Sequence, residues 1–118
     1  MSLMLTLSFN SSVSGIRAAI DMRDLSAHNT ANINTDGYKK KRVNLSEGTN
    51  NGVFVNISGS TERGMLYKNE KGNILETSNV NYPEEIATQI SVTHLLSANI
   101  AVINRTDEAY EDLLDIIA

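Results

Sequence analysis

The glycines of this chain are confined almost entirely to its middle. Six of the seven lie between Gly37 and Gly72, the seventh is Gly15, and no glycine or proline follows Pro83. Both residue types interrupt helices, so their absence favours long helices and their clustering favours turns and short strands. The sequence therefore predicts three successive parts: a helix, an irregular middle with short strands, and a second helix.

The first helix is predicted over about residues 11–34. Asn10, Ser11 and Ser12 can each act as an N-cap, so the helix should begin near them. Two apolar stripes follow at helical spacing, which suggests burial against more than one neighbour. One stripe comprises Val13, Ile16, Ile20 and Ala27, continues to Thr30 and is interrupted by Arg23; the other comprises Ala18, Met22 and Leu25.

The middle, residues 35–80, is predicted to form turns and short strands. The segment Val53–Ile57 alternates weakly and follows Asn50-Asn51-Gly52, in which Asn-Gly is typical of a two-residue hairpin turn. Two further short apolar segments flank the turn-like run Lys68–Gly72. An isolated hairpin is only marginally stable in water, so we expect this region to pack against a helix or against another subunit.

A long second helix is predicted over residues 81–118. Asn81 followed by Glu84 resembles a capping box, and Pro83 is tolerated in a first turn. Seam positions then recur at alternating spacings of three and four, which favours coiled-coil packing. At about 1.5 Å per residue the helix would be roughly 50 Å long, so part of its seam needs a partner from outside the chain. The seam consists of Ile86, Gln89, Thr93, Leu96, Ile100, Ile103, Asp107, Tyr110, Leu114 and Ile117.

The composition fits one small, mainly α domain over residues 1–118 with a small β part. Aromatic residues make up only 5%, and the apolar residues are mostly Ile, Leu, Val and Ala, which suit long helix seams. The chain has no cysteine, so disulfide and thiol chemistry are excluded. No run of 18 apolar residues occurs, so membrane insertion is not expected. The first residues lack the basic region of a secretory signal, so any export must use another route.

The sequence contains little that could carry catalysis, and we expect neither an enzyme nor a cofactor. No HExxH, GxSxG, P-loop or GxGxxG motif occurs. Asp21, Asp24 and His28 share a helical face, but such residues are usually solvated, so no metal site is predicted. The basic run Lys39–Arg42 is a weak case for nucleic acid binding because the net charge is −4. The run could instead face the acidic segment 84–115 of a neighbouring subunit.

The turn after the first helix has the most distinctive pattern. Gly37 is the best candidate for a positive φ, and Asn32 and Asn34 could satisfy the last helix carbonyls or the turn amides. The turn resembles the "NNIANxNTxGFK" signature of the N-terminal region of bacterial flagellar rod and hook proteins. The residues of this stretch assigned to the motif turn are Asn29, Asn32, Asn34, Thr35, Gly37 and Tyr38.

The second half of the chain resembles the same family. The segment Gly72–Asn81 is similar to the family's "G-x-LE-x-SNV" motif and is followed by Glu84-Glu85-Ile86. Further on, the family pattern "EAN-xx-VI-xx-ADEM-xx-LL" is matched at Ala98-Asn99, Val102-Ile103, Asp107-Glu108 and Leu113-Leu114. The middle is short, so the chain looks most like a small proximal-rod protein.

This resemblance implies a structural subunit of the flagellar basal-body rod. The N- and C-terminal helices would pair as an antiparallel coiled-coil hairpin and pack with neighbours into a tube that crosses the periplasm and transmits torque. The expected partners are other rod subunits, the chain itself and the flagellar export apparatus, which exports without a cleaved signal. The expected assembly seam comprises Val13, Ile16, Ile20, Ala27, Ile86, Leu96, Ile100, Ile103, Tyr110 and Leu114.

A second reading remains open. The same long seams could belong to a small helical-hairpin adaptor or chaperone that binds a partner helix in a groove. Such a protein would not need the Asn-rich turn or the Ser78-Asn79-Val80 segment. Homotypic polymerisation would separate a rod subunit from an adaptor, which should form a complex of fixed stoichiometry.

Overall fold

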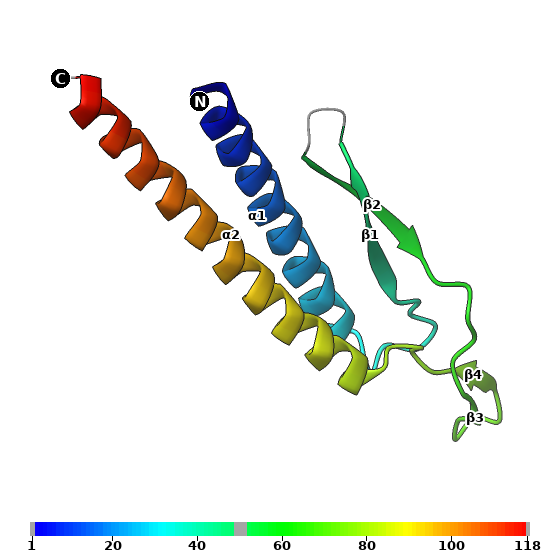
Figure 1. The fold of residues 1–118 in the computed structure, drawn as a ribbon. Helices are drawn as coiled ribbons and strands as arrows, with labels where there is room; N and C mark the ends of the chain where they lie inside the picture. The colour runs from blue at the N-terminus through cyan, green and yellow to red at the C-terminus, as the bar shows by residue number, and fades with distance from the viewer. Residues whose placement is uncertain (1, 49–51, 118) are drawn as a thin grey trace.

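The chain forms an elongated two-helix body with a β-hairpin along its side and a second, smaller hairpin at one end. The computed structural model describes residues 2–48 and 52–117, and its extents are 78 × 24 × 14 Å. Helices α1 (Ser2–Ala31) and α2 (Tyr82–Ile117) lie side by side and run in opposite directions (Figure 1). The expected mainly helical fold with a small β part is confirmed.

Helix α1 begins ten residues earlier than the expected start near Ser12, so the prediction of that boundary is wrong. Ser11 and Ser12 lie inside the helix, where the Ser14 hydroxyl donates to the Ser11 carbonyl at 2.7 Å. The first turns instead lie against the end of α2, where Thr6 Oγ1 and Tyr110 Oη are 2.9 Å apart. Packing of this kind overrides the local preference of Ser and Asn for a cap.

The end of α1 follows the sequence prediction closely. The Asn32 side-chain amide donates to the His28 carbonyl at 2.8 Å and thus satisfies one of the last free carbonyls. Gly37 has a φ of 72°, which confirms the predicted positive value, and its N–H donates to the Glu76 carbonyl at 2.8 Å. Asn34 is exposed, and its side chain makes no hydrogen bond to the described part of the chain.

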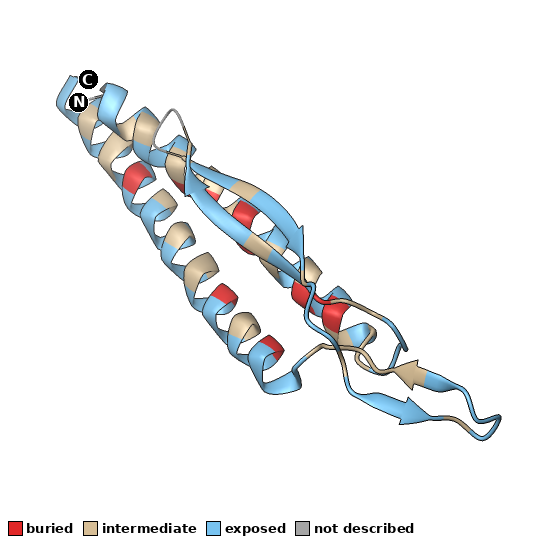
Figure 2. Cartoon of the chain, turned by 90° about the vertical axis from the view of Figure 1, so that its right-hand side faces the viewer, coloured by how far each residue is buried: buried red, intermediate tan, exposed pale blue. Residues whose placement is uncertain are grey.

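Strands β1 (Lys41–Glu47) and β2 (Val53–Gly59) form an antiparallel hairpin that lies along α1 (Figures 1 and 2). Val43 pairs with Ile57 and Leu45 with Val55, so these four side chains share one face of the hairpin. The predicted strand Val53–Ile57 is confirmed as part of β2. Two residues of the predicted turn, Asn50 and Asn51, lie outside the described residues.

A second antiparallel hairpin lies beyond the end of α1. Strands β3 (Leu66–Lys68) and β4 (Ile74–Glu76) pair through Tyr67 and Leu75, and Gly72 in the turn between them has a φ of 83°. This arrangement confirms the predicted turn over Lys68–Gly72. The hairpin lies at the end of the body away from both Ser2 and Ile117 (Figure 1).

Helix α2 has the predicted extent and the predicted cap. The Glu84 N–H donates to the Asn81 side-chain oxygen at 3.3 Å, as an N-cap requires. By length and composition alone the helix is apolar enough to cross a membrane. Apolar helices that pack against protein meet the same criterion, so the absence of membrane insertion stays a prediction.

The core of the described chain is very small. Its buried apolar residues are Ala18, Ala19 and Val92, and no large side chain is fully buried. Large apolar side chains instead lie exposed along α2, including Ile90 at 56% and Leu114 at 63% of their surface. An exposed apolar surface of this extent is unusual for a protein that acts alone.

Candidate functional site

The expected seam residues divide into two groups by exposure. Five are half-buried between the elements of this chain, and five are exposed. The half-buried residues are Val13, Ile16, Leu96, Ile103 and Tyr110; the exposed residues are Ile20, Ala27, Ile86, Ile100 and Leu114. The exposed group is available to a second chain, and its role in assembly stays a prediction.

One of the expected rows on each helix is displaced, because the buried residues lie one position before it, whereas the second expected row of α2 is half-buried at Gln89, Leu96, Ile103 and Tyr110. On α2 the buried or half-buried row is Glu85, Val92, Asn99, Thr106 and Leu113, where the sequence indicated Ile86, Thr93, Ile100, Asp107 and Leu114. On α1 the buried row is Ser12, Ala19 and Ser26, where the sequence indicated Val13, Ile20 and Ala27. The most buried row of α1 is therefore made of small residues, the facing row of α2 is partly polar, and several larger apolar side chains of both helices are exposed.

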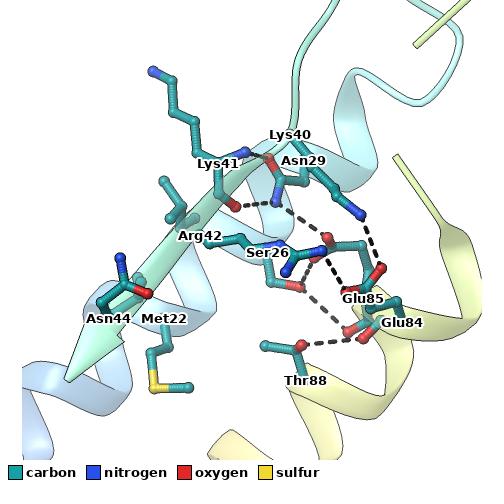
Figure 3. A pocket seen from close by; sticks show the side chains of 12 residues that line it. Met22, Ser26, Asn29, Lys40, Lys41, Arg42, Asn44, Glu84, Glu85 and Thr88 are labelled. Atoms are coloured by element: carbon teal, nitrogen blue, oxygen red, sulfur yellow. Dashed lines mark hydrogen bonds and ion pairs between the residues drawn. The ribbon is translucent and has the colours of Figure 1, made fainter. Parts of the chain in front are cut away.

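Asn29 is the centre of a buried polar cluster at the junction of α1, β1 and α2 (Figure 3). Its side-chain nitrogen donates to the Lys41 carbonyl at 2.8 Å and to Glu85 Oε1 at 3.1 Å. Its oxygen accepts from the Tyr38 hydroxyl at 2.8 Å and from the Lys41 N–H at 3.0 Å. An amide offers two donors and two acceptors, so Asn29 is fully satisfied. It bonds both backbone groups of Lys41, as a neighbouring strand would.

Glu85 is the second member of this cluster and is only 6% exposed. Its Oε2 accepts from the Ser26 hydroxyl at 2.6 Å, and the Gln89 amide donates to the same hydroxyl at 3.3 Å. The carboxylate lies in the first turns of α2, where the helix dipole favours negative charge. The donors around Glu85 are thus neutral groups on α1 rather than a cation.

The basic run after the turn bonds to acids of its own chain. Lys39 pairs with Glu76. The buried Lys40 ammonium lies 3.1 Å from Glu84 Oε2, and the Arg42 guanidinium lies 3.3 Å from Glu84 Oε1. The sequence suggested acids of a neighbouring subunit, but these three cations already have acidic partners here. Lys40 and Arg42 reach Glu84 because β1 begins beside the first turn of α2, and Lys39 reaches the end of β4.

The polar cluster also affects Tyr38. Burial of its ring, together with the nearby charge of Glu85, raises the pKa of the Tyr38 hydroxyl above its ordinary value of 10.0. The tyrosine therefore stays a neutral donor to Asn29 at physiological pH. His28 packs against the same ring, with the two ring centroids 5.8 Å apart.

A surface pocket of about 320 Å³ lies beside the cluster, with Met22, Asn44 and Thr88 among the residues around it (Figure 3). Several of its polar groups are bonded to one another, as in the Thr88 hydroxyl that donates to the Glu84 carbonyl at 3.0 Å. Within the described residues no group of His, Asp and Glu could hold a metal ion. The arrangement can fix elements in place: the hydroxyl that lies next to a carboxylate, Ser26 beside Glu85, is buried, with only 2% of the serine exposed.

The sequence identified part of this cluster and missed the rest. Asn29 and Tyr38 stood out as members of the motif turn, and Thr35 bonds Asn32 in that turn at 3.1 Å. Glu85 and Asn99 appeared only within longer motifs with no contact assigned to them, and Ser26 was not among the candidate residues. The available signal was their heptad spacing, which is hidden when only apolar residues are followed. No protein-family model matches the chain, and no curated protein matches it either.

Proposed function

We propose that this chain is a structural, non-enzymatic subunit of a bacterial flagellar basal-body rod that assembles through its two terminal helices. In this proposal α1 and α2 pair as an antiparallel coiled-coil hairpin and pack against other rod subunits and further copies of the chain. The product is a tube in the periplasm that transmits torque, and its subunits reach it through the flagellar export apparatus.

The observation that carries the proposal is the imbalance between buried and exposed apolar surface. Over residues 2–48 and 52–117 the apolar core consists of two alanines and one valine, whereas both helices expose larger side chains. On α1, Met4 is 71% exposed and Phe9 is 45% exposed; on α2, Ile100 is 46% exposed and Ile116 is 81% exposed. Burying apolar surface stabilises association by about 25 cal/mol per Å², so such helices favour assembly.

The shape of the molecule supports the same proposal. The body is 78 Å long and only 14 Å thick, so most residues lie close to the surface. Many such bodies laid side by side would bury the outward rows of both helices at once.

The test is self-association of the full chain at rising concentration, followed by sedimentation and electron microscopy. Wild type should form particles far larger than the 12.9 kDa chain, and they should be elongated. Ile100→Asp should remove assembly because its carboxylate would be desolvated in the contact. Ser91→Asp is the matched control, because it adds the same charge at an exposed position on another face of α2 and should leave assembly intact.

The place in the cell is tested separately. Antibody labelling of basal bodies from cells that express the tagged chain should mark the rod, and cells with Ile100→Asp should lose both the label and motility. The alternative function is an adaptor or chaperone that binds a partner helix. A wild-type chain that stays monomeric at every concentration and forms only a complex of fixed stoichiometry would favour that alternative.

A further inference from the structure

The helix pair has a register problem that its apolar residues do not solve. The inner row of α1 consists of Ser12, Ala19 and Ser26, which are all small. Because these side chains are similar in size, sliding α2 by one heptad would bring similar surfaces together. Packing along this row therefore distinguishes poorly between registers, as in coiled coils whose seams are uniform.

Contacts at three heights mark one register along the pair, two of them hydrogen bonds and one a close approach of a side chain to a glycine. Ser26 and Asn29 bond Glu85 at one end, Asn99 lies over Gly15 in the middle, and Thr6 bonds Tyr110 at the other end. The contact at Glu85 is buried on both sides, with Ser26 and Asn29 each 2% exposed. The contact between Thr6 and Tyr110 is open to solvent. The polar contact at Glu85 is therefore the one that would lose most in a slipped pairing.

We infer that Asn29 and Glu85 form a register latch that fixes the height at which α1 and α2 pair. If α2 slipped by one heptad in one direction, Val92 would take the place of Glu85. In the other direction, Glu85 would move out of reach of Ser26 and Asn29, which donate to it. Either way Asn29 would lose a buried acceptor, and an unsatisfied buried polar group is costly. A single buried polar residue sets register in coiled coils by the same effect.

The latch also ties register to the position of the β1–β2 hairpin. Asn29 holds both the N–H and the carbonyl of Lys41, the first residue of β1, while it bonds Glu85 on α2. The Tyr38 hydroxyl donates to the side-chain oxygen of the same Asn29 amide. An Asn29 side chain that turned to follow a slipped α2 would have to release β1. Helix register and hairpin position are therefore set together, and this inference does not depend on the proposed function.

The experiment measures register directly in the full chain. The sequence has no cysteine, so Ser8→Cys and Ser91→Cys create two exposed sites for spin labels, one on each helix. The two sites lie at different heights, so a slip changes the distance between the labels. One heptad corresponds to a displacement of about 10 Å along the axis. The labelled chain with Asn29 and Glu85 unchanged should give a single distance between the two labels.

Three further variants are compared on this labelled background. Asn29→Asp places a second carboxylate next to Glu85 Oε1, which is 3.1 Å from the amide nitrogen it replaces. It should produce a second distance with helix content retained. Glu85→Gln added to Asn29→Asp restores a donor opposite an acceptor and should recover the single distance. Asn32→Asp is the matched control, since the Asn32 side chain bonds His28 and Thr35 within its own turn and makes no other hydrogen bond to the described part of the chain.

The outcomes separate a latch from a general stabilising contact. A single, unchanged distance between the labels in Asn29→Asp would overturn the inference. A second distance in Asn32→Asp, populated as strongly as in Asn29→Asp, would overturn it too. If Asn29→Asp loses its helix content, the double variant decides. Return of the original distance in the double variant supports the latch, and failure to return overturns it.

Discussion

A Cβ atom added to Gly15 would lie 2.5 Å from Oδ1 of Asn99 on the facing helix. The Asn99 amide is held there by its hydrogen bond to the Leu95 carbonyl at 2.8 Å. The glycine is therefore needed for close approach of the two helices rather than for a turn. Glycine lowers the stability of α1 by about 1 kcal/mol relative to alanine, and the closer packing of the two helices offsets this loss.

Gly15→Ala should therefore lower the free energy of unfolding, although alanine is the better helix former. Displacing Asn99 should cost more than the gain in propensity, for a net loss of about 1 kcal/mol. In an Asn99→Ala background the clash is gone, so the same change should stabilise by about 1 kcal/mol. Urea unfolding followed by circular dichroism measures both, and a stabilising Gly15→Ala in the wild-type background would contradict the close approach.

Gly37→Ala should destabilise the fold for a different reason. Nothing lies within 4 Å of a Cβ at this position, so the cost comes only from its φ of 72°. Alanine in that conformation costs about 1–2 kcal/mol. Gly59→Ala is the matched control, because it also has open space around it and no left-handed backbone. Equal stability of the two variants would remove the case for a special backbone at Gly37.

Glu76→Gln should reduce the acid sensitivity of the protein. The hydrogen bond from Lys39, helped by the Gly64 N–H at 2.8 Å, holds the pKa of Glu76 below its ordinary 4.5. A carboxyl whose pKa is lower in the folded state contributes stability above its ordinary pKa and loses that contribution as the pH falls through the folded value. Acid titration of unfolding should thus be flatter for Glu76→Gln. Glu70→Gln, in the exposed turn of the same hairpin, should keep the wild-type profile.

Tyr38 should make the fold sensitive to alkali. Its pKa is raised above 10.0 in the folded chain by burial and by Glu85, so the folded state favours the neutral phenol. This contribution is complete below pH 10.0 and is lost as the pH rises through the raised pKa, because the unfolded chain ionises first. Tyr38→Phe removes the hydrogen bond to Asn29, so its free energy of unfolding should be about 1 kcal/mol lower at neutral pH. The variant should also lack this loss of stability at high pH.

The control for that prediction is Tyr82→Phe, whose ring is 52% exposed at the start of α2. This variant should retain the wild-type loss of stability at high pH. If Tyr82→Phe and Tyr38→Phe have the same alkaline profile, the buried hydroxyl at Tyr38 is not the group responsible.

Local features of the fold could be predicted from the sequence, because short-range rules determine them. The positive φ of Gly37, the cap at Asn81 and the turn before Gly72 each depend on residues within a few positions. The start of α1 could not be predicted, because contacts with the last turns of α2 extend that helix past three good capping residues. Packing over about 100 residues of separation outweighs a local preference there.

The candidate site could be predicted only in part, for a related reason. Asn29 was identified within a turn motif, but its bond to Glu85 spans 56 residues of sequence. Glu85 looked like a solvated charge at a helix start, since most glutamates are exposed. Following apolar periodicity selected Ile86 and Ile100, and the structure places the polar residues one position earlier at the contact between helices.

The turn between β3 and β4 lies at the end of the body remote from residues 2 and 117 (Figure 1). Extra residues inserted between Lys71 and Gly72 would project away from the helix pair and would touch neither the latch nor the outward rows. The molecule is thus built so that its length can be varied at one end without changing the part that packs. This turn is accordingly a suitable position for a peptide tag or an inserted domain that reports on the protein without disturbing its contacts.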